Sequence, residues 1–172
     1  KQDGAGNKDG SSWENATDNL QLAVGIAATA NPVGQVWAAA GTYVGGGAGN
    51  VNAFTMEAGV KVYGGFAGNE PASYDLSLRD FDLNITRLDG QNLQQIMRRD
   101  YTTSNNRDIL NGITFQNGRS NREGGAAYLK NCDIDYCQFL NNTMVWEGDY
   151  PSGHGGGALY TSNCNIYHST FM

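Results

Sequence analysis

The sequence predicts an all-β fold in which short strands stack as the turns of a solenoid. The main observation is a segment that occurs twice: residues 124–134 (GGAAYLKNCDI) return as residues 156–166 (GGALYTSNCNI), a shift that defines the long offset. The match continues to Phe139 and its copy Phe171. A looser copy lies upstream around Phe115, and the shorter distance along the chain from Phe115 to Phe139 defines the short offset. Repeats of this length are typical of a solenoid, because one unit cannot bury its own apolar face and must stack on its neighbours.

The second observation is the pattern of residues 35–172, where short apolar runs alternate with turn residues. Gln35–Tyr43 and Val60–Phe66 alternate as strands do, and further short strands are expected over 85–115. Short strands at close spacing, with Asn, Asp and Gly between them, indicate an all-β body. The short offset suits a turn made of three short strands and three bends.

Residues 1–34 differ from the body and are expected to form a leader and a capping helix. The stretch 17–30 predicts a short amphipathic helix with apolar residues at helical spacing, Leu20, Val24 and Ala27. Pro32 ends this helix, because the residue before a proline avoids the helical conformation. Such a helix would cover the first strand edge, which otherwise invites pairing with another chain. The expected division is therefore 1–34 and 35–172.

The repeat also predicts which side chains lie in the core. The side chains expected to point inward are Val36, Val62, Ile109, Ile113, Phe115, Ile134, Phe139, Ile166 and Phe171. Two pairs test the repeat directly, because Cys132 and Cys164, and likewise Phe139 and Phe171, should stack at about 4.8 Å, one strand spacing. Asn131 and Asn163 also hold equal positions and predict an amide ladder at a corner.

Composition excludes several classes of protein. The 172 residues include 24 glycines but only 3 prolines, so the chain is not a disordered Pro/Gly tract. Seventeen acidic and eleven basic residues give a net charge of −6 without a basic cluster, which argues against a nucleic-acid partner. No apolar run approaches the roughly 20 residues of a membrane-spanning helix.

The three cysteines predict a buried ladder rather than a metal site. Cys132 and Cys164 share a repeat position, and their expected separation falls within disulfide range. Side chains of stacked strands run parallel, which favours reduced thiols, and a disulfide stays open as the alternative. Zinc is not expected, since neither a CxxC pair nor a suitable His/Cys spacing occurs.

Five runs in the N-terminal half carry a resemblance to a known family. They are Asp9–Trp13 (DGSSW), Val36–Tyr43 (VWAAAGTY), Val62–Glu70 (VYGGFAGNE), Arg79-Asp80 and Leu88–Gly90 (LDG). In this order they resemble the N-terminal region of bacterial secreted right-handed parallel β-helix proteins. Gly124–Ala126 and Phe139–Asn142 resemble repeats of chlamydial-type polymorphic outer-membrane proteins and related β-helix adhesins.

The resemblance implies a right-handed parallel β-helix with a short N-terminal capping helix, exported to the outer-membrane surface of a Gram-negative bacterium or beyond it. Most such proteins have no assigned activity. The chain starts at Lys1 without a signal peptide and stops at Met172 within a repeat unit. We therefore expect a trimmed N-terminal part of a longer protein.

The expected function is that of a non-catalytic surface or secreted module, adhesin-like or scaffold, which binds glycan or a cell-surface protein through its loops. A scaffold lipoprotein of an outer-membrane assembly is a variant of this hypothesis. The alternative is a polysaccharide lyase or hydrolase of the pectate-lyase-like β-helix type, with its active coils beyond residue 172. Such an enzyme needs stacked carboxylates with Lys or Arg on one face, which this stretch lacks.

The candidate ligand-binding residues lie in the extra residues that make one repeat unit longer than the unit before it. This excess falls in Asn142–His154, and insertions in solenoids form loops on one face, often the binding face. Its aromatic rings could stack on sugars beside polar partners. The candidates are Trp146, Glu147, Asp149, Tyr150 and His154. An ordinary surface loop whose aromatic residues fold back onto the strands is the competing interpretation.

An acidic site is a weaker hypothesis. Asp133 and Asp135 should project together from one strand, next to Ile109 and Asn111 on one side and to 165–167 on the other. Neither neighbour adds a carboxylate, whereas calcium takes six or more oxygen ligands and a glycosidase needs two facing carboxylates. We expect no cofactor, and calcium remains an open alternative.

Overall fold

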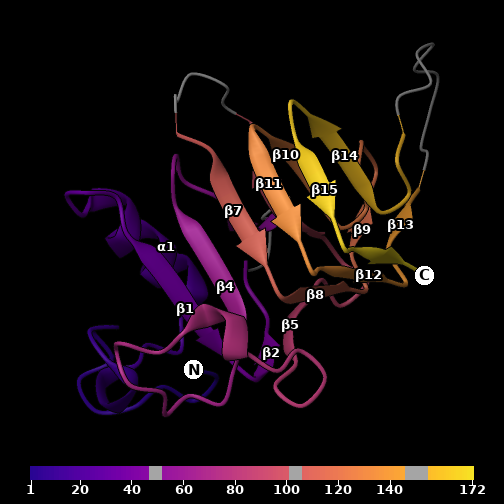
Figure 1. The fold of residues 1–172 in the computed structure, drawn as a ribbon. Helices are drawn as coiled ribbons and strands as arrows, with labels where there is room; N and C mark the ends of the chain where they lie inside the picture. The colour runs from indigo at the N-terminus through magenta and orange to yellow at the C-terminus, as the bar shows by residue number, and fades with distance from the viewer. Residues whose placement is uncertain (47–51, 101–105, 146–154) are drawn as a thin grey trace.

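The strands of the protein form parallel sheets, as seen in a computed structural model that describes residues 1–46, 52–100, 106–145 and 155–172 (Figure 1). The first sheet has the order β1-β4-β7-β11-β15. Its strands are β1 (Gln35–Ala39), β4 (Lys61–Phe66), β7 (Asp108–Asn111), β11 (Cys132–Asp135) and β15 (Asn165–Tyr167).

Two further parallel sheets accompany the first one. The second has the order β16-β12-β8-β5-β2, and the third has the order β14-β10-β6-β3. The second sheet contains β2 (Gly41–Tyr43), β5 (Thr86–Asp89), β8 (Ile113–Gln116), β12 (Gln138–Leu140) and β16 (Thr170–Phe171). The third contains β3 (Asn52–Thr55), β6 (Gln95–Arg99), β10 (Ala127–Lys130) and β14 (Leu159–Ser162), and the short pair β9 (Arg119–Ser120) and β13 (Thr143–Met144) lies between the second and third sheets along the chain.

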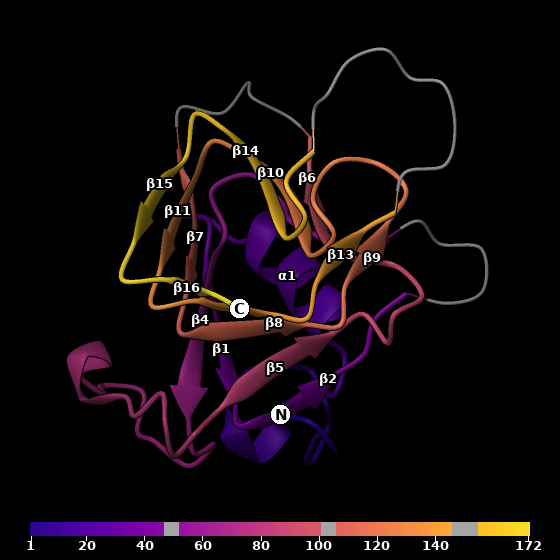
Figure 2. The same cartoon turned by 90° about the vertical axis from the view of Figure 1, so that its right-hand side faces the viewer.

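The chain visits the three sheets in turn, and the sequence repeat coincides with the strand pairing. Phe115 pairs with Phe139 at the short offset, and Phe139 pairs with Phe171 at the long offset. The rings of Phe139 and Phe171 stack with centroids 4.7 Å apart, and the Cys132 N–H lies 3.4 Å from the Cys164 sulfur. Both predicted pairs are therefore confirmed. Figure 2 shows the sheets around a common interior, with α1 behind them.

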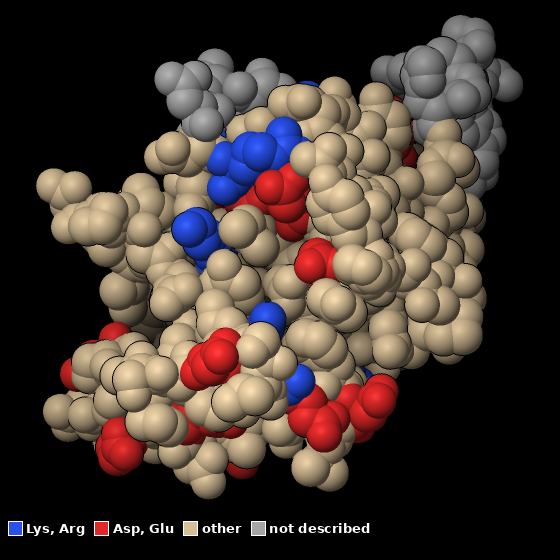
Figure 3. All heavy atoms as spheres, viewed as in Figure 1, with Lys and Arg blue, Asp and Glu red and all other residues tan. Residues whose placement is uncertain are grey.

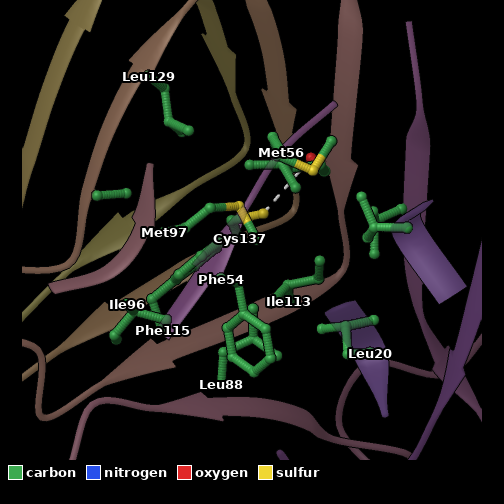
Figure 4. Packing of buried hydrophobic residues seen from close by; sticks show 14 of the residues in the cluster. Leu20, Phe54, Met56, Leu88, Ile96, Met97, Ile113, Phe115, Leu129 and Cys137 are labelled. Carbon is green, nitrogen blue, oxygen red and sulfur yellow. Dashed lines mark hydrogen bonds between the residues drawn. The ribbon is translucent and has the colours of Figure 1, made fainter. Parts of the chain in front are cut away.

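The core fills this common interior with side chains from all three sheets. Figure 4 shows Phe54 and Met97 of the third sheet close to Leu88, Ile113 and Phe115 of the second, with Leu129 of the third sheet further along the same interior. Six of the predicted core residues are buried, namely Val36, Val62, Ile113, Phe115, Ile134 and Phe139.

Three of the predicted core positions need correction. Ile109 lies in register with Asp133 and is only half-buried, whereas its neighbour Leu110 pairs with Ile134 and is fully buried. Because side chains alternate across a strand, one residue of displacement moves Ile109 to the outer face. Ile166 and Phe171 stack on buried partners but stay 42% and 49% exposed, since no further described strand covers β15 and β16.

The helix α1 (Leu20–Thr29) confirms the predicted helix in the N-terminal part. The Asn19 side chain caps it by accepting a hydrogen bond of 3.0 Å from the Leu22 N–H. Its buried residues, Leu20, Val24 and Ala27, belong to the common core. Two short 3-10 helices, Trp13–Asn15 and Leu76–Leu78, lie in the leader and in the long connection after β4.

The corners between strands use residues with left-handed backbone conformation. Asn131 and Asn163 link the third sheet to the first with φ of 59° and 56°, and Asn is one of the residues that tolerate this region best. The Asn163 side-chain amide donates to Asn131 Oδ1 at 3.0 Å, so the predicted amide ladder is confirmed. The corners from the first sheet to the second also contain residues with positive φ, namely Gly112, Tyr136 and His168.

Candidate functional site

The five loop residues predicted to bind ligand all lie outside the described residues. They are Trp146, Glu147, Asp149, Tyr150 and His154, and they belong to the stretch 146–154. Ligand binding by these residues therefore stays a prediction. In the sequence they lie between β13 and β14.

The outer face of the first sheet carries the acidic residues that the sequence singled out. Asp133 Oδ1 accepts hydrogen bonds of 2.8 Å from Arg107 Nε and 2.8 Å from the Asn165 side chain. Arg107 also donates to the Cys132 carbonyl at 3.0 Å, which holds the guanidinium against the strand. Figure 3 shows basic and acidic residues side by side on this face. The charge of Asp133 is thus matched by a neighbouring cation.

Asp135 has partners of its own two residues further along β11. Asn111 donates to Asp135 Oδ2 at 3.3 Å, and His168 Nδ1 lies 2.9 Å from Asp135 Oδ1. The expected neighbours of both aspartates are confirmed, because Asp133 pairs with Ile109 and Asn165, and the register places Asn111 and Tyr167 beside Asp135. Among the described residues, no group of three His, Cys, Asp or Glu side chains could hold a metal ion.

Sequence reasoning missed an arginine and an aromatic residue that come to this face from the long connection after β4. Arg79 donates to the Gly64 carbonyl at 2.9 Å and to Asn111 Oδ1 at 2.8 Å, and its guanidinium lies 5.1 Å from the Tyr63 ring. Burial lowers the pKa of Arg79, although nearby Tyr63 and Asp135 oppose this shift. No repeat marks this connection, so only the distribution of arginine and aromatic residues could have indicated it.

The Phe81 ring joins a column of rings along the corner from the first sheet to the second. Phe81 stacks on Tyr136 at 5.2 Å, and Tyr136 stacks on His168 at 4.7 Å. A Cβ atom on Gly112 would lie 2.5 Å from the Phe81 ring, so the glycine leaves the space that Phe81 occupies. The column ties the long connection to the repeated strands.

A groove of about 600 Å³ lies between the leader, α1 and β1. Gly34–Ala38 line it on the side of the strand, and Ala23, Ile26 and Ala30 line it on the side of the helix. Trp13 and Trp37 close it with rings 6.5 Å apart, and the Trp37 ring stacks at 4.8 Å on Phe66. Two of the three tryptophans of the chain thus lie here, a signal that the sequence analysis did not use.

A buried ion pair links the third sheet to the first, and the sequence analysis did not predict it. Arg99 Nε lies 2.6 Å from Asp108 Oδ2, and both side chains are almost fully buried. Asp108 also accepts a hydrogen bond of 2.6 Å from the Gly59 N–H. Burial raises the pKa of Asp108, against the opposing effects of Gly59 and Arg99. The pair has a structural role at the start of β7.

The cysteines are free thiols, as the ladder interpretation expected. Burial raises the pKa of Cys137 to about 12 and also raises the pKa of Cys132 and Cys164. Because the thiolate is the reactive form, these raised values make the three thiols poor nucleophiles.

Comparison of the chain with protein-family models, with curated proteins and with solved structures gives no match. Within the described ranges, no helix combines the length and the hydrophobicity that crossing a lipid bilayer requires.

Proposed function

We propose that the protein is a right-handed parallel β-helix that serves as a non-catalytic binding module. In this proposal the three sheets are the faces of the helix, and α1 is its N-terminal cap. Strand pairing at both repeat offsets supports the stacking of successive turns. The right-handed sense follows the strong preference of connections between parallel strands. The resemblance to exported β-helix proteins favours a location outside a Gram-negative cell or on its outer membrane.

The observation that carries the non-catalytic part of the proposal is the pairing of carboxylates on the outer face of β11. Asp133 is matched by Arg107, and Asp135 by Asn111 and His168. A glycosidase needs two carboxylates placed to share proton donation and attack on one bond. Carboxylates that are already paired with cations and amides suit recognition by hydrogen bonds better than acid–base chemistry.

The proposed ligand is a glycan, bound by the loop that follows β13. Its Trp146 and Tyr150 would stack on sugar rings, while Glu147, Asp149 and His154 would accept or donate hydrogen bonds to hydroxyl groups. A loop of this kind, carried by a rigid stack of strands, is a common arrangement in binding proteins.

A panel of soluble polysaccharides tests this proposal, and it includes pectins, uronic-acid polymers and host glycans. Binding is measured by calorimetry, and cleavage by new reducing ends and by the ultraviolet absorbance of unsaturated products, each with and without calcium. We expect saturable binding without cleavage. Trp146→Ala should weaken it about tenfold, the equivalent of about 1.4 kcal/mol.

The matched control is Leu83→Ala, which truncates a highly exposed leucine in the long connection after β4 and should leave binding unchanged. Cleavage of any polymer would overturn the non-catalytic proposal in favour of a lyase or hydrolase. Absence of binding to every polymer would overturn the proposal that the ligand is a glycan and would favour a protein partner.

A further inference from the structure

Among the described strands, β1 has one partner in its sheet. It pairs with β4, and no other described strand follows it in the order of the first sheet. An edge strand presents a row of backbone N–H and C=O groups that can pair with another chain, and proteins usually cover such an edge. Figure 1 shows α1 alongside β1, at the end of the stack far from the C-terminus.

The cover that α1 provides leaves a groove rather than a closed contact. The Gly34 N–H, directly before β1, donates to the Ala27 carbonyl at 2.9 Å and joins the end of the helix to the start of the strand. Beyond this point the groove follows the consecutive residues Gly34–Ala38, which span roughly 16 Å at about 3.3 Å per residue. Its volume of about 600 Å³ falls in the range of pockets that hold ligands.

The walls of the groove combine apolar and acidic side chains. Ile26 lines the groove on the helix side and is 44% exposed, so its apolar side chain is accessible to a ligand in the groove. Asp9, Glu14 and Glu70 line it on the other sides, against Lys1 as the one basic residue of the lining. Glu70 is occupied, since its carboxylate accepts from the N–H groups of Ala67, Gly68 and Asn69. Asp9 accepts a hydrogen bond of 2.9 Å from the Ser11 N–H, and both Asp9 and Glu14 are exposed to solvent.

We propose that this groove binds an extended, basic peptide segment of a partner protein, which adds to the edge of β1 as a further strand. Main-chain hydrogen bonds to β1 would supply affinity, as in other cases of strand addition to a sheet edge. Alternate side chains of the peptide would pack on Ile26 and Ala23, and a lysine or arginine would approach Asp9 and Glu14. This site is independent of the loop after β13.

Two fluorescent peptides of alternating valine and threonine test the proposal, one with a central lysine and one with a central glutamate. Fluorescence anisotropy measures their binding to the full chain. We expect the lysine peptide to bind at least tenfold more tightly than the glutamate peptide. Binding should weaken at high salt, because the carboxylates are exposed and screened. Equal binding of the two peptides, or no saturable binding, would overturn the basic-peptide proposal.

The paired variants Ile26→Gln and Leu22→Gln locate the site, because glutamine removes the apolar side chain without adding a charge. Both residues lie on α1 and are similarly exposed, at 44% and 48%, but only Ile26 lines the groove. We expect Ile26→Gln to lower the affinity at least tenfold and Leu22→Gln to leave it unchanged, with circular dichroism confirming that both fold. Equal effects of the two variants would contradict the site.

A measurement on the unaltered chain keeps the test independent of the variants. Hydrogen exchange of the β1 amides should slow when the lysine peptide is added, because pairing protects an edge strand. Unchanged exchange over 34–38 at saturating peptide would overturn strand addition. Displacement of the peptide by a neutral oligosaccharide would show that the groove is a sugar site instead.

Discussion

At the scale of single residues, the same type of side chain contributes differently to the free energy of unfolding according to its position in a stack. Phe115, Phe139 and Phe171 form one column, with ring centroids 5.0 and 4.7 Å apart. Phe139 has a ring on both sides and is fully buried, whereas Phe171 has one neighbour and is half-exposed. The cost of removing a ring should therefore depend on its position in the column.

The variant Phe139→Ala should lower the free energy of unfolding by about 3–5 kcal/mol, since it removes a large buried ring and leaves a cavity. Phe171→Ala is the matched control and should cost less than about 2 kcal/mol, because half of its surface already contacts water. Guanidinium denaturation measures both. Similar losses for the two variants would contradict the stacked core.

Arg99 and Asp108 give a second prediction at this scale. Arg99→Met removes the ion pair with a buried carboxylate and should cost about 3–5 kcal/mol at neutral pH. The added substitution Asp108→Asn should restore part of the loss, because the amide oxygen can still accept from Gly59 while no charge is buried. A double variant less stable than Arg99→Met alone would contradict this explanation.

The same pair predicts a dependence on pH. Asp108 has a folded pKa above its ordinary value of 3.8, so the folded state holds its proton more tightly than the unfolded state. This group therefore favours folding at low pH, and its contribution falls as the pH rises from 3.8 through the folded pKa. In Arg99→Met the folded pKa of Asp108 should rise further, because the opposing effect of Arg99 is removed. The loss caused by Arg99→Met should therefore shrink as the pH falls from the folded pKa of the variant to the folded pKa of the unaltered chain. Denaturation at several pH values checks the sign.

At the scale of elements, the long connection between β4 and β5 is held against the repeated strands by a few side chains. Arg79 binds the Gly64 carbonyl and Asn111, and Phe81 stacks on Tyr136. Gly112, with φ of 74°, provides the space for the Phe81 ring. The connection is thus held by its own side chains, which do not belong to the repeat but contact residues of the repeated strands and corners.

Phe81→Ala should release this connection with little loss of global stability, about 1 kcal/mol, the worth of an aromatic pair. Limited proteolysis within 67–85 should become several-fold faster, because local opening becomes easier. Leu83→Ala, in the same connection but highly exposed, should leave the cleavage rate unchanged. Equal rates for Phe81→Ala and the unaltered chain would contradict the proposed anchoring.

Elements could be predicted from the sequence where it has a clear period, whether that of the repeat, of a strand or of a helix. The period identified the pairing of β11 with β15 and of β12 with β16, and helical spacing identified α1. β3 was missed because Asn52–Thr55 follows a glycine-rich stretch and has no copy at the repeat offset. Ile109 was misplaced because both it and Leu110 are apolar, so alternation could not choose between them.

The candidate sites were less predictable than the strands, for a physical reason. A stack of strands imposes its spacing on the sequence, whereas Trp13, Trp37 and Arg79 meet their partners through segments that lack any period. Contacts between such segments depend on where the chain returns in space. Composition can indicate the residue types, but the groove beside β1 needed the structure.

At the scale of the whole molecule, the two ends of the stack differ. α1 packs at the end that contains β1 and β3, while the other end exposes Ile166, Tyr167 and Phe171 beside the edges of β15 and β16. Exposed apolar side chains next to unpaired strand edges favour pairing with another chain.

The 172-residue chain should therefore self-associate as its concentration rises, which sedimentation velocity can follow. The double substitution Ile166→Lys and Phe171→Lys should shift the chain towards monomer, since charges on an edge oppose pairing. Leu93→Lys adds a charge at an exposed leucine away from this end and should not have that effect. A chain that stays monomeric at every concentration would contradict the prediction.

The corners of the stack also determine where the protein can accept new sequence. The connections from the first sheet to the second after β7, β11 and β15 are short, namely 112, 136–137 and 168–169, and an insertion there would displace the strand register. The connection from the second sheet to the third runs over 117–126 before β10 but over 141–158 before β14, and this difference accounts for the two repeat lengths. From β7 onwards, loop grafting and the natural gain of new binding segments should therefore succeed along this one side, whereas the corner from the first sheet to the second is long only earlier in the chain, at 67–85.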